Sequence, residues 1–398
     1  MTKTNVPRLR FKGFDGEWKS GSLGDKLNVV MGQSPHSENY TSDYKQNILV
    51  QGNADISNGK IKPRIYTKEI TKVSKKNEII MTVRAPVGEL AFNQFDDVVI
   101  GRGVASLSGN SFDYFLLDRT KKMGIWNRLS SGSTFDAVNS NDIKSMPISF
   151  PKINEQEIIG SFFKKIDKLI ELQTKRLEQL KKLKQGYLQK IFLQDGEVVP
   201  RLRFSGFKDD WNRDKLENNV HFIQGNDGYN TGIPILTISA GNGWMDQKER
   251  FGSVLAGNEL KNYTLLTKGQ LSYNHGNSKI AKYGAVFCLK GYDKALVPKV
   301  YHSFELKNGS PEFLENLFKS KIPDRQLRKL ITSGARMDGL LNIGKKAFGS
   351  IVLGFPEQDE QQKIGEFFSK LDQLINYHSN KIDVLKKQKK SYLQKMFI

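Results

Sequence analysis

Two parts of the sequence carry residue types that could perform phosphate or metal chemistry. Gly339 to Lys345 reads GLLNIGK, which has the glycine and lysine spacing of a nucleotide-binding phosphate loop. The following residue is Lys346, at the position where such a loop needs serine or threonine to hold magnesium. Bulky leucine and isoleucine side chains also stand where the loop backbone must wrap closely around a phosphate. The motif therefore does not predict a nucleotide site.

A metal-dependent nuclease centre could be drawn from Asp293 followed by Glu305 and Lys307. The second half of this pattern recurs at 259–261, and it arises easily by chance in a lysine-rich chain. The histidines and the single cysteine, Cys288, are scattered, and none lies at metal-ligand spacing from another. We expect no catalytic residue and no metal site in this chain, and a stand-alone nuclease is the less favoured alternative.

The overall charge predicts an acidic partner. The 398 residues hold 62 Lys and Arg against 42 Asp and Glu, a formal net charge of +20. Such a surplus suits nucleic acid or an anionic membrane surface. The sequence has no apolar run of membrane-spanning length, and one cysteine excludes a disulfide framework. Because residues 1–11 lack an apolar stretch, we expect no secretory leader. We expect a soluble cytoplasmic protein that does not enter a membrane.

The elements that position any site are duplicated. Residues 6–18 and 199–211, here called the stems, are identical at nine of 13 positions, at an offset of 193. The segments that begin at Glu155 and Glu360 align without a gap over 38 residues, with 19 identities, at an offset of 205. The inserts between them, about 19–150 and 212–355, show almost no agreement beyond 130–136 against 332–338. A shared frame around different inserts indicates two readers of different targets.

The repeated 38-residue segments predict two long helices that pair with each other. Their apolar residues recur in alternating steps of four and three, as in a coiled coil, and polar residues interrupt both series at equivalent places. At 1.5 Å per residue each helix would be about 57 Å long, which suits a spacer. The predicted seam consists of Ile166, Ile170, Leu177, Leu180, Tyr187, Ile191, Leu371, Ile375, Ile382, Leu385, Tyr392 and Met396. Two unrelated amphipathic helices, each packed on its own domain, are the alternative.

Each insert predicts a curved sheet with long loops and a helical patch near its C-terminal side. Short β-branched runs alternate with Gly and Pro, and basic helical segments follow near 113–128 and 312–331. The predicted fold class is α+β, with two mixed α/β domains separated by two antiparallel coiled-coil helices in a pseudo-two-fold arrangement. The predicted boundaries are 1–153, 154–195 for the first spacer helix, 196–358, and 359–398 for the second.

These features together resemble the specificity subunit of type I restriction-modification systems. The resemblance rests on the repeated stem VPRLRF, on helices that end in GYLQKIF and SYLQKMF, and on RAPVGELAF and GRGVASL in the first insert. It covers nearly the whole chain. In the second insert SYNHGNSK stands where text like RAPVG is expected, so this insert resembles a second sub-type of recognition domain.

The resemblance implies a non-catalytic subunit that reads a split sequence in double-stranded DNA, with one half for each recognition domain. It implies two methyltransferase subunits and restriction or translocase subunits as partners. S-adenosylmethionine, ATP and Mg would then bind those partners and not this chain. A nucleic-acid-binding coiled-coil scaffold outside restriction is the alternative from another class.

Side chains that could reach a groove are the candidates for DNA contact, because Arg and Asn can read bases while Lys usually holds phosphate. The candidates are Arg84, Arg102, Lys121, Lys122, Arg128, Ser131, Thr134, Asn274, His275, Asn277, Lys279, Arg325, Arg328, Lys329 and Arg336.

Overall fold

The computed structural model describes residues 5–130, 137–228, 232–253, 257–276, 278–331 and 340–398. The chain divides into two compact units, one of residues 1–174 with 380–398 and the other of residues 175–379. Each unit therefore holds one insert together with parts of both long helices, whereas the sequence predicted boundaries at the helix ends. Within the described residues, no helix is long and apolar enough to cross a membrane.

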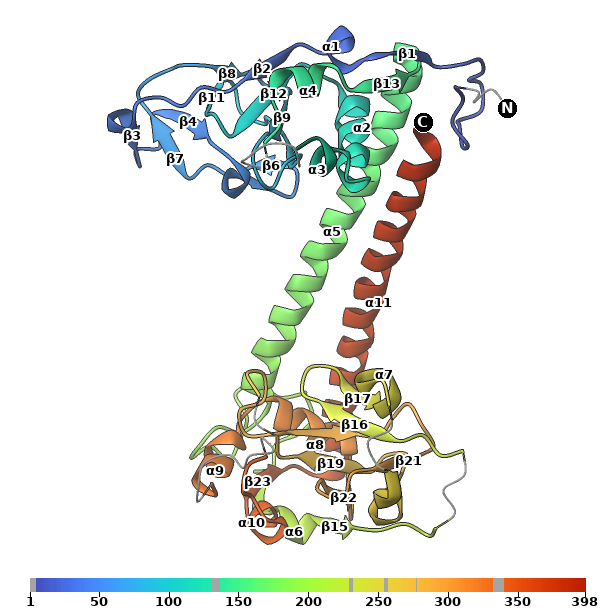
Figure 1. Cartoon of the computed structure of the whole chain (residues 1–398). Coiled ribbons are helices and arrows are strands. Elements are labelled where there is room, and N and C mark those ends of the chain that lie inside the picture. Colours follow the sequence, from blue (N-terminus) through green and yellow to red (C-terminus); the bar gives the residue numbers. More distant parts are fainter. Residues whose placement is uncertain (1–4, 131–136, 229–231, 254–256, 277, 332–339) are drawn as a thin grey trace. The chain divides into compact units, whose positions relative to one another are not determined.

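The first unit places its insert in two main sheets and four α-helices (Figure 1). One sheet has the order β2-β12-β9-β10-β6-β5 and the other β3-β7-β4-β11-β8, while β1 pairs with β13. The elements are β1 (Lys19–Ser22), α1 (Leu23–Lys26), β2 (Val29–Met31), β3 (Tyr40–Thr41), β4 (Asn47–Val50), β5 (Ile56–Ser57), β6 (Lys60–Ile61), β7 (Ile65–Thr67), β8 (Val73–Ser74), β9 (Ile79–Thr82), β10 (Leu90–Phe92), β11 (Val98–Ile100), β12 (Val104–Leu107), α2 (Ser111–Lys122), α3 (Ile125–Ser130), α4 (Ser140–Lys144) and β13 (Pro147–Phe150).

The second unit has a four-stranded sheet of order β15-β22-β19-β20 and three two-stranded pairs, β14-β23, β16-β17 and β18-β21. Its elements are β14 (Asn212–Lys215), α6 (Leu216–Asn219), β15 (Val220–Ile223), β16 (Leu236–Ser239), β17 (Gly243–Asp246), α7 (Gln247–Phe251), β18 (Thr264–Thr267), β19 (Leu271–Asn274), β20 (Ala285–Cys288), β21 (Lys294–Val297), β22 (His302–Leu306), α8 (Pro311–Lys319), α9 (Asp324–Lys329), α10 (Lys345–Gly349) and β23 (Val352–Phe355).

The two inserts share a sheet that their sequences do not reveal. The order β2-β12-β9-β10 in the first insert matches β15-β22-β19-β20 in the second, and all of these neighbours are antiparallel. In both inserts a helix follows the sheet, α2 or α8, and the last strand, β13 or β23, pairs with the first, β1 or β14. The predicted α+β class is confirmed, and the duplication extends into the inserts.

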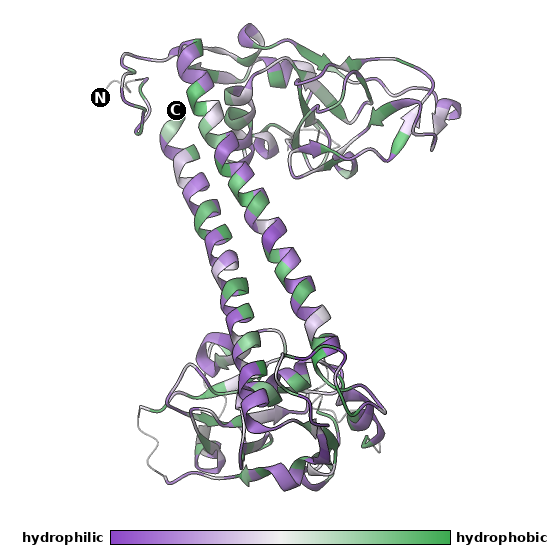
Figure 2. Ribbon diagram, turned by 180° about the vertical axis from the view of Figure 1, so that it is seen from behind, coloured by the Kyte–Doolittle hydropathy of each residue, from purple (hydrophilic) through white to green (hydrophobic). Residues whose placement is uncertain are grey.

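The two long helices are α5 (Ile153–Ile191) and α11 (Gln358–Met396), and hydrophobic and hydrophilic residues alternate along both (Figure 2). The first helix begins at Ile153, one residue before the predicted boundary, and the buried Gln156 side chain donates a 2.7 Å hydrogen bond to the Pro151 carbonyl oxygen. Gln361 donates to Pro356 in the second copy, at 2.9 Å.

Each unit combines helix segments from both copies of the repeat. In the first unit, the start of α5 and the end of α11 enter one hydrophobic core, which includes Phe163 and Phe397. In the second unit, the end of α5 and the start of α11 do the same, with Phe192 and Phe368. Phe192 corresponds to Phe397 and Phe163 to Phe368 at the offset of 205, so the two cores are built by equivalent residues.

Side chains on α5 and α11 contact each other in equivalent pairs. The rings of Phe162 and Tyr392 lie 5.2 Å apart in the first unit, and those of Tyr187 and Phe367 lie 5.0 Å apart in the second. Equivalent ion pairs join Lys389 to Asp167 at 2.7 Å and Lys184 to Asp372 at 2.5 Å. Within each unit the helix segments are therefore partners and not separate amphipathic helices.

All twelve predicted seam residues are buried or half-buried. Three of them, Ile166, Ile191 and Met396, belong to the cores that also contain insert residues, so they anchor the inserts as well as the helices. Burial lowers the pKa of Lys184, one of the polar residues that interrupt the seam, with the neighbouring Lys319 acting in the same direction. The ion pair with Asp372 opposes this shift.

The stems tie the inserts to the helix ends by the same contacts in both units. The Leu9 amide donates to the Lys395 carbonyl oxygen at 2.9 Å, and the Leu202 amide donates to Lys190 at 2.9 Å. Arg10 binds Glu155 through two nitrogens, and Arg203 binds Glu360 in the same way. These are two fork-like pairs with carboxylates that are almost fully buried. The hydrogen bond to Glu360 raises the pKa of Arg203.

Candidate nucleic-acid interface

Two arginines of the first insert that are candidates for DNA contact lie at one end of its sheet. Arg84 follows β9 and Arg102 lies in the turn between β11 and β12, and both are exposed. The residues next to them are hydrogen-bonded to each other, since the Val83 amide donates to the Gly103 carbonyl oxygen at 2.9 Å. The Val138 amide in turn donates to the Val83 carbonyl oxygen at 3.0 Å. The fold thus joins three distant segments through backbone groups next to the exposed residues Arg84 and Arg102.

The two lysines of α2 that are candidates for DNA contact form ion pairs within the insert. Lys121 lies 2.6 Å from Glu89, and Lys122 lies 2.6 Å from Asp118 one helical turn away. Their charge is partly offset by these carboxylates, so they are weaker candidates for phosphate contact than Arg84 or Arg102. Arg128, in α3, is exposed.

The second insert places Asn274 and His275 at the equivalent end of its sheet, where β19 ends. The side-chain nitrogen of Asn274 donates to the Ile238 carbonyl oxygen, and its side-chain oxygen accepts from the Gly276 backbone amide, so this side chain already shapes the loop. The Leu341 amide donates to the His275 carbonyl oxygen at 2.8 Å, just as Val138 does to Val83. Lys279, further along the loop, is exposed.

The prediction that His275 reaches a DNA groove is wrong. Only 7% of the residue is exposed, and its ring nitrogens lie 2.7 Å from the Leu341 carbonyl oxygen and 2.9 Å from that of Val300. Its ring also lies against His302, at a centroid distance of 5.1 Å. His275 joins three chain segments, and sequence alone could not distinguish this role from base contact.

The basic residues of α9 lie elsewhere on the second unit. Arg325 forms an ion pair with Asp195, in the segment that follows α5, and Arg328 and Lys329 are exposed. Four candidates, Ser131, Thr134, Asn277 and Arg336, lie outside the described residues.

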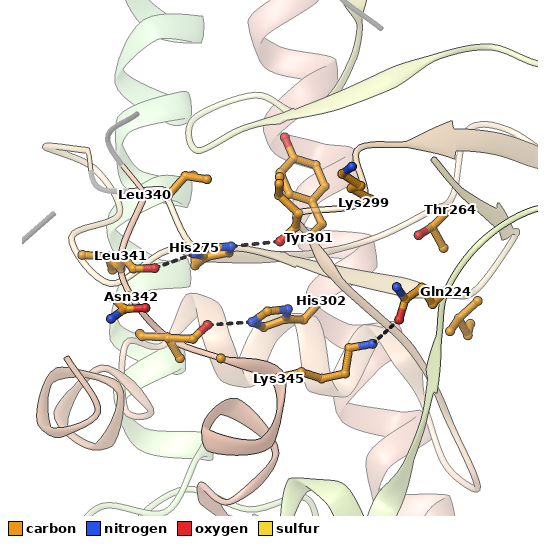
Figure 3. A pocket seen from close by; sticks show the side chains of 14 residues that line it. Gln224, Thr264, His275, Lys299, Tyr301, His302, Leu340, Leu341, Asn342 and Lys345 are labelled. Atoms are coloured by element: carbon orange, nitrogen blue, oxygen red, sulfur yellow. Dashed lines mark hydrogen bonds between the residues drawn. The ribbon is translucent and has the colours of Figure 1, made fainter. Parts of the chain in front are cut away.

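The structure adds a pocket of about 300 Å³ in the second insert, which the sequence did not predict (Figure 3). Its walls include the end of β15, the turn before β22 and residues 340–345, which belong to the rejected GLLNIGK motif. Lys345 donates to the side-chain oxygen of Gln224 at 3.0 Å, and Lys299 also lines the pocket. In the sequence, the lysine that ends GLLNIGK is the feature that could have indicated this pocket.

Burial lowers the pKa of His302, another lining residue, to about 4. Its Nε2 lies 2.8 Å from the Ile343 carbonyl oxygen, which opposes but does not cancel the effect of burial. His302 is therefore neutral near pH 7, and the positive charge of the pocket wall comes from its lysines.

Asp293 and Glu305 of the hypothetical nuclease centre lie at separate strands of the second insert. Among the described residues, no group of three or more His, Cys, Asp or Glu side chains could hold a metal ion. Glu305 of the hypothetical nuclease centre lies on β22 and accepts a 2.9 Å hydrogen bond from Gln270, while Asp293 lies before β21 in another strand pair. Cys288 is buried, and burial raises its thiol pKa to about 12, so it is a poor nucleophile.

Comparison with known proteins gives a consistent result. Residues 15–182 and 214–387 match the family described as the type I restriction modification DNA specificity domain. Over 176 residues the chain is 33% identical to the putative type I restriction enzyme MjaX specificity subunit of Methanocaldococcus jannaschii, covering 42% of this chain and 41% of that protein. Over 121 residues it is 31% identical to the MjaIX specificity subunit of the same organism, covering 28% and 27%. The chain thus matches less than half the length of these relatives.

Among solved structures, the chain resembles the S subunit of a type I restriction-modification system from M. genitalium, with a TM-score of 0.64 and 16% identity over 99% of both chains. It also resembles a chain from a study of complex assembly and conformational transition of the type I R-M system, with a TM-score of 0.50 over 96% and 97% of the two chains. At such identities these likenesses concern the fold. With two matched segments covering most of its length, the chain belongs to the family of type I restriction-modification DNA specificity domains, which it contains twice.

Proposed function

We propose that this chain is the DNA-recognition subunit of a type I restriction-modification complex and that each insert reads one half of a split DNA sequence. The observation that carries this proposal is the pair of matching sheets, each of which presents different residues at its end. Arg84 stands at the end of β9 and Gly276 at the corresponding place after β19, while the stems and helices around them are alike. A common scaffold with different loop chemistry suits two different half-sites.

The chain supplies recognition and no chemistry in this proposal. The methyl donor S-adenosylmethionine would bind methyltransferase subunits, and ATP and Mg would bind restriction or translocase subunits. Two methyltransferase subunits suit the pseudo-symmetric repeat, because equivalent surfaces can bind equivalent partners. Action on cellular DNA would place the complex in the cytoplasm.

Exposed apolar side chains on the long helices support this assembly role. Leu169 and Leu172 are 45% and 49% exposed, and the equivalent Leu374 and Tyr377 are 49% and 55% exposed. Apolar side chains repeated at equivalent exposed positions are typical of surfaces that bind a partner. The same contact could therefore be made once in each unit.

Exchange of one insert tests the function. Residues 212–355 would be replaced by the corresponding insert of another family member, and the methylome of a host carrying the chain and its methyltransferase would be sequenced. We expect one half of the methylated sequence to change and the other half to stay. Replacing residues 19–150 should change the opposite half, which makes it the matched control. If both halves of the methylated sequence changed in either chimera, the proposal that each insert reads its own half would be wrong.

A coiled-coil scaffold that binds nucleic acid outside restriction would behave differently. It would bind duplexes without producing a methylated sequence that follows the insert. Gel shifts at several salt concentrations, with duplex and single-stranded DNA and with the methyltransferase added, separate the two functions.

A further inference from the structure

The pocket of the second insert has the composition of an anion site. It is lined by Ile223, Gln224, Thr264, His275, Lys299, Val300, Tyr301, His302, Leu340, Leu341, Asn342, Ile343, Gly344 and Lys345. These described lining residues include two lysines and several hydrogen-bonding side chains, but neither Asp nor Glu. A volume of about 300 Å³ is ample for a phosphate group and part of its sugar.

The geometry of residues 340–345 removes an objection raised by the sequence. Bulky residues in GLLNIGK were expected to keep the backbone away from a phosphate. In the structure Leu341 and Ile343 are only 4% and 2% exposed and pack into the hydrophobic core, and Leu340 is half-buried in the pocket wall, so these side chains line the pocket and leave its volume open. Lys345 is half-buried, and its ammonium lies 3.0 Å from the Gln224 side-chain oxygen (Figure 3).

Lys299 occupies the place that Arg102 occupies in the first insert. The carbonyl groups of Val83 and His275 are equivalent, because each accepts a hydrogen bond from a later backbone amide, that of Val138 or that of Leu341. Met81 and Tyr273 each lie two residues earlier and are therefore equivalent as well. Their partners on the adjacent strands are Ala105 and His302. Arg102 and Lys299 each precede these partners by three residues. Both inserts thus carry a cation at the same end of the shared sheet, although their sequences do not align there.

Within the described part of the chain, Glu259 competes for Lys299. Its ammonium lies 3.1 Å from a carboxylate oxygen of Glu259, and both side chains are more than half exposed. An exposed pair of this kind contributes little to stability, so a phosphate can replace the carboxylate at small cost.

From this charge, shape and position we propose that the pocket binds a backbone phosphate of the DNA half-site read by the second insert, with Lys345 and Lys299 as its cationic ligands. The inference rests on the proposed function and identifies one contact point for it. The contact holds the duplex in register and does not read a base, because a lysine–phosphate contact carries no direct sequence information.

The test uses the full chain assembled with its methyltransferase and measures duplex binding by fluorescence anisotropy over a range of salt concentrations. Lys345→Gln removes the charge in the pocket, and Lys346→Gln, its exposed neighbour, is the matched control. We expect Lys345→Gln to weaken binding about five- to tenfold, equally for cognate and unrelated duplexes. The slope of log affinity against log salt should fall by about 0.9, as for the loss of one phosphate contact. Lys345→Arg should restore both, which excludes misfolding as the cause.

Equal effects of Lys345→Gln and Lys346→Gln would overturn the proposal while leaving the proposed function intact. Failure of the wild-type complex to bind duplex DNA would instead overturn the proposed function and the inference with it. Inorganic phosphate at constant ionic strength distinguishes the two sources of the anion. If it binds the wild-type pocket but Lys345→Gln leaves DNA affinity unchanged, the site holds a free anion and the DNA assignment is wrong.

Discussion

Gly365 of α11 lies against the start of α8, and its replacement tests how the long helix holds the second insert. A Cβ atom at this position would lie 2.5 Å from the Ser310 hydroxyl oxygen, 3.0 Å from the Glu312 Cβ and 3.2 Å from the Phe313 amide nitrogen. Ser310 is the N-cap of α8, and its hydroxyl accepts from that same amide. The added methyl group must therefore displace either the cap or the helix itself.

The magnitude follows from two opposing effects. Alanine in place of glycine inside a helix gains up to about 1 kcal/mol. Overpacking a tight contact costs about 1–3 kcal/mol, and loss of a serine cap costs about 1 kcal/mol. For Gly365→Ala we expect a net loss of about 1–2 kcal/mol in the free energy of unfolding. Gly186 in α5 is the matched control, because a Cβ there meets nothing within 4 Å and it lies in the same compact unit.

Urea unfolding of the two variants beside the wild type checks this reasoning. Gly186→Ala should stabilise the second unit by about 0.5–1 kcal/mol, which places the two variants about 1.5–3 kcal/mol apart. If Gly365→Ala stabilised the protein as much as Gly186→Ala, the close approach of α11 to α8 would be refuted. Gly160, at the equivalent position of α5, should repeat the loss in the first unit, since its Cβ would lie 2.8 Å from the Phe112 amide nitrogen.

Three further outcomes follow from buried groups. Arg203→Met leaves the Glu360 carboxylate buried without its cation and should cost about 3–5 kcal/mol in urea unfolding, whereas Arg201→Met, at an exposed ion pair, should cost less than about 1 kcal/mol; equal costs would contradict the burial argument. Cys288 should resist iodoacetamide in the folded chain at mildly alkaline pH and react on unfolding, because burial raises its pKa to about 12; rapid labelling of the native protein would contradict this. Burial lowers the His302 pKa to about 4, so between its ordinary value and about 4 the unfolded chain binds a proton that the folded chain does not. The free energy of unfolding should therefore fall over that range as pH falls, and the His302→Phe variant should lose less of it than the wild type. Parallel pH profiles of the urea midpoint for the two proteins would refute this.

The duplicated stems and helices were predictable because they keep their residue types. A coiled-coil seam needs apolar side chains at fixed spacing, and the two copies share it position by position. From this pattern the sequence predicted paired helices, two inserts and an α+β class. The fork-like Arg10–Glu155 and Arg203–Glu360 pairs lie within the same repeated segments, but their partners are too far apart in sequence to be recognised before folding.

The site depended more on tertiary structure. Composition pointed to nucleic acid or an anionic membrane, and the resemblance to a specificity subunit implied DNA. The loops near Arg84 and Asn274 were candidates because basic and amide side chains suit DNA contact wherever they lie. Composition could not show that His275 would be buried between backbone carbonyl groups, or that Lys299 would stand where Arg102 stands. Strand register decides both, because it aligns residues through hydrogen bonds between distant segments. A sequence specifies that register only through the packing of the whole sheet.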